Sequence, residues 1–227
     1  MKKLLALILA ALLGASLAFC LTSCDDEEKT DNGTSSDEIV GGWSSPDSVK
    51  VTDEAASALK KATEKLAGGT YEPIALLGTQ VVAGTNYRLL CTFTPATEGA
   101  DASYTIVTVY EDLEGNAEIT EILNSDAKVN VTAEVIDGGW VAPETPDVTE
   151  EAGKALQAAV SQMVGAQYNP LALMGTQVVA GTNYCLLCEI TPVVENPESH
   201  YSVVTVYQGA DGTTSVVETL DFSAQAE

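Results

Sequence analysis

The two cysteines of Cys185-x-x-Cys188 have the spacing of a redox motif or of half a zinc site. They fall in an apolar segment typical of a β-strand, where residues three apart face opposite sides of the sheet. The two thiols therefore cannot readily share a metal ion or form a disulfide. Cys91 has the same apolar surroundings as Cys188, so we interpret both as small buried hydrophobic residues. The sequence predicts no metal site.

The sequence offers few candidates for catalytic side chains. His200 is the only histidine, so any histidine-dependent general base would have to be this residue. Acidic residues are too numerous and too scattered to single out a pair for glycoside hydrolysis, and no glycine-rich phosphate loop occurs. We therefore predict that the protein is not an enzyme and has no catalytic residues and no cofactor.

The net charge of the chain argues against two classes of partner. It carries 33 acidic and 10 basic residues, which gives a formal net charge of −23 at pH 7. This excess of negative charge argues against nucleic acid as a partner, since binding there depends on neutralising phosphates. It also argues against adhesion to anionic lipid by charge alone.

The amino terminus has the features of an export signal. Lys2 and Lys3 precede an apolar run from Leu4 to Leu21, and Leu21-Thr22-Ser23-Cys24 resembles the lipobox at which bacteria acylate a cysteine. We predict a lipoprotein signal peptide over 1–23, lipidation of Cys24, and an acidic flexible tether over 24–40. The protein would then be anchored by its lipid in the cell membrane, facing the periplasm or the cell exterior. A retained transmembrane helix and an ordinary secretory cleavage are the alternatives.

An internal repeat dominates the rest of the chain. Gly41-Gly42-Trp43 recurs as Gly138-Gly139-Trp140, and the ten residues from Gly78 to Tyr87 recur from Gly175 to Tyr184. The offset is 97 residues in both cases, and no gap is needed. We predict two domains, over residues 41–136 and 137–227. At this offset His200 corresponds to Ser103, which further weakens a catalytic role for the histidine.

The sequence pattern of each copy predicts a helix followed by strands. Thr52 and Thr149 can cap the two helices, whose predicted apolar stripes are Ala55, Leu59, Ala62 and Leu66 in the first copy and Ala152, Leu156, Ala159 and Met163 in the second. Segments rich in Val, Ile, Thr and Tyr then predict a four-stranded meander. A helix with one apolar stripe would cover a sheet with one apolar face, so we expect an α+β fold in each copy, with one helix packed on an antiparallel sheet. The predicted strands of the first copy are 74–82, 85–94, 103–110 and 116–122, and residues 128–135 are a further strand or a connector.

The pentapeptide Gln-Val-Val-Ala-Gly occurs once in each copy and resembles the Gln-x-Val-x-Gly motif of the cystatins. The following Thr-Asn-Tyr resembles the stefin branch of that family, and the glycine pair and helix that precede the motif also match. The resemblance covers most of residues 41–227 and implies two cystatin-like domains. It further implies reversible, non-covalent inhibition of papain-like cysteine proteases by a wedge made of an N-terminal glycine segment and two hairpin loops.

The resemblance places the wedge on residues of both copies. The glycine pairs would lie along the protease cleft, the paired valines would enter it, and the last glycine of each motif would allow a tight turn and close approach. The second hairpin lacks the bulky apolar pair found in most cystatins. The predicted protease-binding residues are Gly41, Gly42, Gln80, Val81, Val82, Ala83, Gly84, Gly138, Gly139, Gln177, Val178, Val179, Ala180 and Gly181, together with Leu113, Gly115, Ala210 and Gly212 on the second hairpins.

Two other interpretations stay open. The pentapeptides can be tight hairpins whose valines are tucked under the helix, and Trp43 and Trp140 can either recognise a ligand or cover an edge of the core. A non-inhibitory adhesion or scaffold role at the cell surface is the alternative function, since small folds of this kind host unrelated activities.

Overall fold

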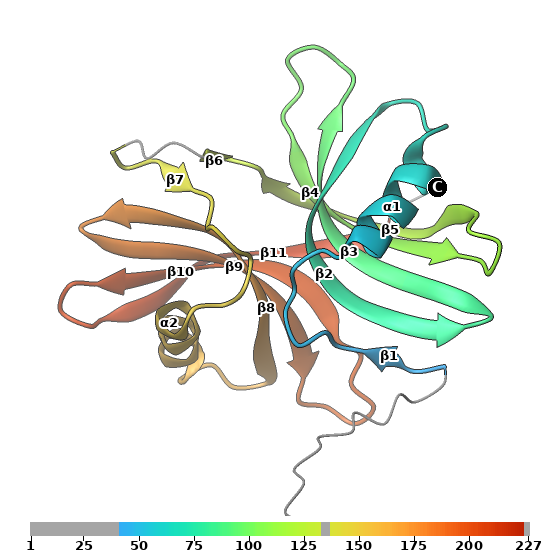
Figure 1. Ribbon diagram of the computed structural model, residues 1–227. Helices are drawn as coiled ribbons and strands as arrows, with labels where there is room; N and C mark the ends of the chain where they lie inside the picture. The colour runs from blue at the N-terminus through green and yellow to red at the C-terminus, as the bar shows by residue number, and fades with distance from the viewer. Residues whose placement is uncertain (1–40, 133–136, 225–227) are drawn as a thin grey trace, which may run out of the picture. The chain divides into compact units, whose positions relative to one another are not determined.

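The computed structural model describes residues 41–132 and 137–224 (Figure 1). The predicted signal peptide, the tether and Cys24 lie outside the described residues, and so do residues 133–136, which belong to the segment predicted as a further strand or connector. We refer to residues 41–132 as the N-terminal half and to residues 137–224 as the C-terminal half.

The strands of both halves join into one curled sheet. Its order is β1-β2-β3-β4-β5-β11-β10-β9-β8-β7-β6, and every neighbouring pair is antiparallel except β6 with β7. The N-terminal half contains β1 (Trp43–Ser44), α1 (Asp53–Thr63), β2 (Gly69–Val82), β3 (Gly84–Pro95), β4 (Ser103–Glu111), β5 (Ala117–Lys128) and β6 (Val131–Thr132). The C-terminal half contains β7 (Trp140–Val141), α2 (Glu150–Val160), β8 (Ala166–Val179), β9 (Gly181–Pro192), β10 (His200–Gly209) and β11 (Thr214–Ala224).

This architecture corrects the predicted fold class. The described residues are predominantly β, with two helices of 11 residues each, and they form a single large sheet instead of two cystatin-like α+β domains. The resemblance to a tandem pair of cystatins is therefore wrong at the level of the fold. The physical reason is that the sheet does not end at β5: the outer edge of this strand pairs with β11, so the sheet of one half continues into the other.

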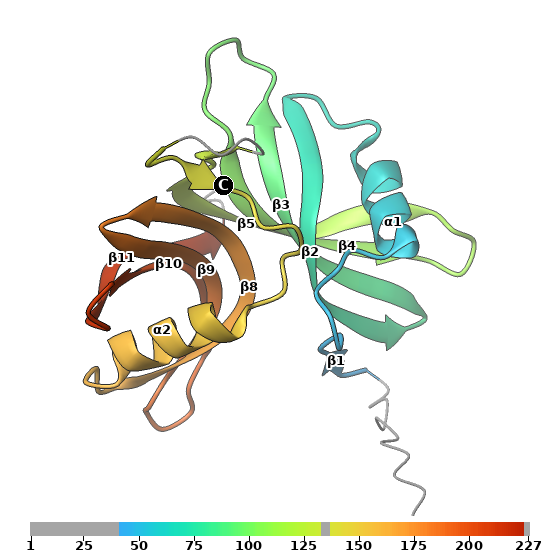
Figure 2. The same cartoon turned by 60° about the vertical axis from the view of Figure 1, so that its left-hand side comes forward.

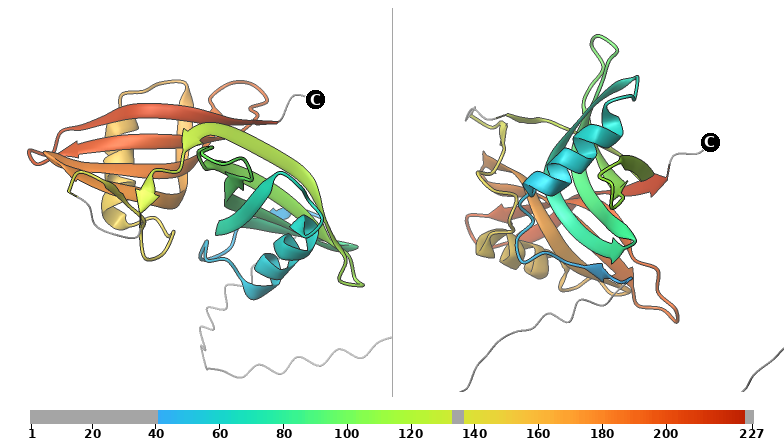
Figure 3. Two further views of the ribbon diagram at one scale, coloured as in Figure 1. Left: turned by 90° about the horizontal axis from the view of Figure 1, so that it is seen from above. Right: turned by 45° about the vertical axis from the view of Figure 1, so that its right-hand side comes forward.

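The junction between the halves is locally two-fold symmetric. Ser125 of β5 lies opposite Phe222 of β11, and these two residues are equivalent in the 97-residue repeat. An antiparallel pair in which equivalent residues face each other is related by a two-fold axis through that pair. Figure 3 shows β11 running beside β5 at the junction. A second contact crosses it, since the Asp147 carboxylate accepts hydrogen bonds from Ser48 Oγ at 3.0 Å and from the Val49 N–H at 3.3 Å.

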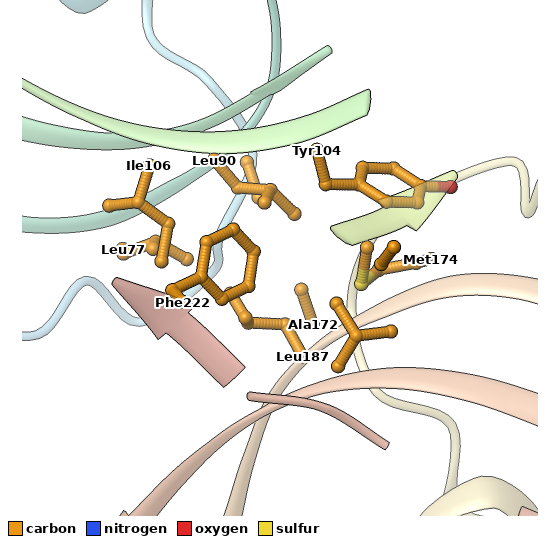
Figure 4. Close-up of a cluster of buried hydrophobic side chains, with 11 residues drawn as sticks. Leu77, Leu90, Tyr104, Ile106, Ala172, Met174, Leu187 and Phe222 are labelled. Carbon is orange, nitrogen blue, oxygen red and sulfur yellow. The ribbon is translucent and has the colours of Figure 1, made fainter. Parts of the chain in front are cut away.

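The sheet is buried on both faces. On one face, α1 covers a cluster that includes Leu89 and Val107, and α2 covers the equivalent cluster of the C-terminal half. Figure 2 shows α2 lying in the curve of β8 to β11. On the other face, side chains of both halves share a central cluster (Figure 4). Its buried members are Ala75, Leu77, Leu90, Tyr104, Ile106, Ala127, Ala172, Met174, Leu187, Val203 and Phe222.

The helices begin where predicted and end earlier than predicted. Thr52 Oγ1 accepts a hydrogen bond from the Ala55 N–H at 3.2 Å, and Thr149 caps α2 in the same way. The predicted stripes extend too far, because Leu66 and Met163 lie beyond the helix ends and are about half exposed. Neither helix of the described residues is long and apolar enough to cross a membrane.

Candidate functional site

The predicted N-terminal tip is the turn between β2 and β3. Val82 and Gly84 face each other in register, so the turn is centred on Ala83. Val81 and Val82 are 44% and 42% exposed. Successive residues of a strand point to opposite faces, and here neither face is covered because the hairpin projects past the core. The valines are therefore not tucked under the helix.

The glycine segment is bound to this tip through Gln80. The Gln80 Nε2 donates a hydrogen bond to the Gly41 carbonyl at 2.9 Å, and the Gly41 N–H donates to the Val81 carbonyl at 3.1 Å. The Gln80 Oε1 accepts from Asn86 Nδ2 at 2.8 Å. Both ends of the glutamine amide are thus used inside the protein. Gln80 holds the Gly41-Gly42 segment against the hairpin, and Asn86 fixes the orientation of that amide.

Gly84 is required by contacts within the chain. It is buried and has a φ of +137°, and a Cβ on it would lie 2.3 Å from the Glu111 carbonyl oxygen and 2.8 Å from the Tyr110 ring. The Tyr110 hydroxyl donates a hydrogen bond to the Ala83 carbonyl at 2.6 Å. The close approach that the sequence suggested for Gly84 is therefore to its own chain, where it lets Tyr110 brace the tip.

The second predicted loop follows β4 and lies beside the tip, because Thr85 of β3 pairs with Glu111 of β4. The Asp112 carboxylate accepts hydrogen bonds from the N–H groups of Glu114 and Asn116 and from the Asn116 side chain, which lower the pKa of this carboxyl. The loop presents Leu113, which is 87% exposed, and its Gly115 has a φ of +82°.

The three segments therefore meet at one end of the strands of this half, at the β2–β3 turn and the loop after β4. We call residues 41–42, 81–83 and 112–115 the N-terminal ridge. Hydrogen bonds link the first segment to the second through Gln80, and Tyr110 links the second to the strand that leads into the third.

The C-terminal half repeats the arrangement, and we call residues 138–139, 178–180 and 209–212 the C-terminal ridge. The Gln177 Nε2 donates to the Gly138 carbonyl at 2.8 Å, and the Tyr207 hydroxyl donates to the Ala180 carbonyl at 2.7 Å. Gly181, with a φ of +146°, repeats the close approach of Gly84, here to the Gln208 carbonyl oxygen. Val178 and Val179 are 71% and 44% exposed, so this tip offers more apolar surface than the first.

The two ridges differ in their second loops. In the N-terminal ridge, Lys61 of α1 contacts the carboxylate of Glu111 at 2.7 Å and the Gly115 carbonyl at 3.0 Å. In the C-terminal ridge, the Asp211 carboxylate bonds the Thr213 N–H and hydroxyl, and its loop exposes Ala210 and Gly212 where the first has Leu113 and Gly115. The N-terminal ridge is thus the more apolar of the two at its second loop and the less apolar at its tip.

Sequence reasoning missed the residues that hold each ridge together. Asn86, Tyr110, Asn183 and Tyr207 make the bracing hydrogen bonds. All four are identical between the copies, and this identity is the signal that could have identified them.

The cysteines are placed as predicted. Cys188 packs in the cluster under α2, whereas Cys185 packs on the opposite face against the central cluster. Burial raises the pKa of Cys91, Cys185 and Cys188 to about 12 in each case, so all three thiols are protonated at neutral pH. Within the described ranges, no group of three or more His, Cys, Asp or Glu side chains could hold a metal ion.

Comparison with known proteins adds no family assignment. No family model matches the chain, and no curated protein matches it.

Proposed function

We propose that this protein is a reversible, non-covalent inhibitor of papain-like cysteine proteases, acting through its two ridges. One observation supports the proposal most strongly. In each half, an exposed valine pair, a glycine segment and a second loop lie together at one end of the strands. Such an edge can enter an open cleft while its tight turn remains out of reach of the nucleophile, so the inhibitor is not cleaved.

The bracing of the ridges supports this proposal. A loop that is already fixed loses little conformational entropy when it binds, and this increases the affinity that a small apolar contact can give. Each tip is held by a glutamine, an asparagine and a tyrosine through hydrogen bonds within the chain. The exposed valines are therefore presented in a fixed position.

The apolar contribution of each tip follows from its exposed surface. Burying a whole valine side chain contributes roughly 1.5–2 kcal/mol. Val178 and Val179 are 71% and 44% exposed, so together they can still bury about the surface of one valine, which corresponds to about 2 kcal/mol or roughly 30-fold in affinity.

Titration of papain and of several cathepsins with the protein tests the proposal. We expect inhibition without cleavage, and the double change Val178→Ser and Val179→Ser should weaken binding at the C-terminal ridge by roughly 30-fold. The matched control is Val193→Ser with Val194→Ser, because these valines are 64% and 62% exposed but follow the opposite end of β9. Absence of inhibition at micromolar concentrations, or equal losses in the two double variants, would contradict the proposal.

A non-inhibitory binding or scaffold role at the cell surface is the second candidate. It is favoured by the second loop of the C-terminal ridge, where Ala210 and Gly212 offer almost no apolar surface to a cleft. If no protease is inhibited, but the valine changes still abolish binding to a cell-surface partner, this second role is the better description.

We also propose that the protein is held at the bacterial membrane by acylation of Cys24. The support is the lipobox sequence Leu21-Thr22-Ser23-Cys24 behind an apolar segment. A Cys24→Ala variant should carry no acyl chain and keep residues 1–23, both of which mass spectrometry of the purified protein measures. Processing at the same position in the variant and in the unaltered protein would contradict the anchor.

A further inference from the structure

Arg88 is the only arginine of the chain and lies in a cage on the N-terminal half. Its guanidinium carbon lies 4.0 Å from the centre of the Trp43 ring, and its Nη1 donates to the Tyr201 hydroxyl at 3.2 Å. Its Nη2 lies 3.5 Å from the Glu121 carboxylate, and its Nε donates to Thr108 Oγ1 at 3.5 Å. An aromatic face, a carboxylate and two hydroxyl groups thus surround the cation, and Tyr201 comes from the other half.

The residues equivalent to those around Arg88 lie together a second time, with a cysteine in place of the arginine. The residues equivalent to Trp43, Thr108 and Glu121 are Trp140, Thr205 and Glu218, and the two-fold relation of the halves supplies Tyr104 in place of Tyr201. The position of Arg88 is taken by Cys185. These five residues, Trp140, Thr205, Glu218, Tyr104 and Cys185, all line one cavity of about 100 Å³.

We propose that this cavity, which we call the Cys185 cavity, binds a guanidinium group from outside the chain. The flat cation would lie where the side chain of Arg88 lies in the other half, on the Trp140 ring and beside the Glu218 carboxylate. The ligand is either a free guanidinium compound or the arginine side chain of a partner polypeptide. The inference is independent of the inhibitor proposal, because the cavity includes no residue of either ridge.

The chemistry of the lining favours an organic cation over the other ligand classes. An indole face attracts cations, and a planar guanidinium can stack on it while it donates to a carboxylate. The Cys185 thiol is protonated because burial and the nearby Glu218 charge raise its pKa, so it offers neither a thiolate ligand for a metal nor a second negative charge. A single carboxylate with two hydroxyl groups and an indole ring is a poor donor set for a metal ion.

Lys128 also lies on the lining of the Cys185 cavity, and its positive charge opposes a second cation. The residue equivalent to Lys128 in the repeat is Gln225, which lies outside the described residues. We expect a Lys128→Gln change to strengthen guanidinium binding, because it removes this repulsion.

Ligand-observed NMR and calorimetry of the whole protein with methylguanidinium test the proposal, with neutral methylurea as the matched ligand. We expect methylguanidinium to bind at one site and methylurea to bind at least about tenfold more weakly, since the contact with Glu218 needs a charge. Glu218→Gln should weaken methylguanidinium binding by about tenfold and leave the circular dichroism spectrum unchanged.

Exchanging the residues at the two equivalent positions gives the sharpest control. Cys185→Arg should fill the cavity from within, abolish methylguanidinium binding and raise the melting temperature. Arg88→Cys should empty the first cage, so that the protein binds two methylguanidinium ions instead of one. Because Arg88→Cys also removes a contact between the halves, Glu218→Gln serves as the independent test if that variant does not fold.

A capped Gly-Arg-Gly peptide distinguishes the two sources of the ligand. Binding at least as tight as that of methylguanidinium identifies an arginine of a polypeptide, and binding of methylguanidinium alone identifies a free small molecule. Equal binding of methylguanidinium and methylurea, no binding of either, or an unchanged affinity in Glu218→Gln would overturn the proposal.

Discussion

Phe222→Ala is expected to destabilise both halves of the sheet together. Phe222 belongs to the C-terminal half, but it is only 6% exposed within the central cluster that both halves share. Truncating a buried phenylalanine costs about 3–5 kcal/mol, and we expect the lower value, about 3 kcal/mol, because β11 ends soon afterwards and can adjust. For a protein of this size the melting temperature should fall by roughly 6–12 °C.

The two tryptophans allow each half to be followed separately. Trp43 reports on the N-terminal half and Trp140 on the C-terminal half, so the change is made in a Trp140→Phe background and in a Trp43→Phe background. Urea unfolding monitored by fluorescence should show the same loss of stability in both backgrounds. Val217→Ala is the matched control on the same strand, because Val217 is 59% exposed and its truncation should cost little.

An unchanged Trp43 transition in the Phe222→Ala variant would refute this reasoning. It would mean that the halves unfold independently and that the shared cluster contributes little. The prediction of two separate domains, over residues 41–136 and 137–227, would then be favoured. The same experiment therefore tests the domain boundary, which stays a prediction.

Three further predictions, two of them substitutions, concern local features. Gly181→Ala should destabilise the protein by about 2 kcal/mol in thermal unfolding, because its Cβ would collide with the Gln208 carbonyl oxygen and its φ is positive. Tyr207→Phe should lower the melting temperature by only about 2–4 °C and weaken any inhibition by up to about fivefold, since a hydrogen bond worth about 1 kcal/mol no longer braces the tip. The raised pKa of Cys91, about 12 instead of 9.0, should make its thiol unreactive to thiol reagents in the folded protein at pH 8. Because the unfolded thiol ionises first, its contribution to stability is complete below pH 9 and is lost between pH 9 and 12, which pH-dependent urea unfolding can measure.

Local features of the fold were accessible from the sequence. The capping threonines, the strand segments and the turn at Ala83 depend on nearest neighbours and on residue types that favour one backbone conformation. The residues of the two ridges were instead predicted from the resemblance of the repeated pentapeptide to the cystatin motif. The strands were longer than predicted, since β2 begins at Gly69 instead of Ile74.

The fold class was predicted wrongly although the sequence contains a continuous apolar run that argues against it. We expected a sheet with one apolar face, yet Leu89, Leu90 and Cys91 are consecutive and all fully buried. Leu89 and Cys91 face α1, whereas Leu90 faces the central cluster. A continuous apolar run of this kind is typical of strands buried on both faces, and it indicates that a second layer must cover the sheet.

Long-range contacts could not be predicted from one copy considered alone. Nothing near Ser125 in the sequence indicates that Phe222 pairs with it, and nothing near Arg88 indicates that Tyr201 of the other half completes its cage. Both contacts depend on the two-fold relation between the copies. The sequence repeat is compatible with this relation but does not require it.

The same two-fold relation sets where the two ridges lie relative to each other, and therefore whether one partner can contact both. β5 begins at Ala117, next to its ridge, and pairs with β11 only at Leu123–Ser125, near its other end. β11 likewise begins at Thr214 beside its own ridge and pairs near its end, and the two strands are antiparallel. The ridges therefore lie at opposite ends of this strand pair (Figure 1). Ala117 and Thr214 are each eight residues from the Ser125–Phe222 pair, in opposite directions, which corresponds to roughly 50 Å of extended strand at about 3.3 Å per residue. A monomeric partner on one ridge does not reach the other, so the two valine tips act as independent sites and can hold two partner molecules on one anchored chain.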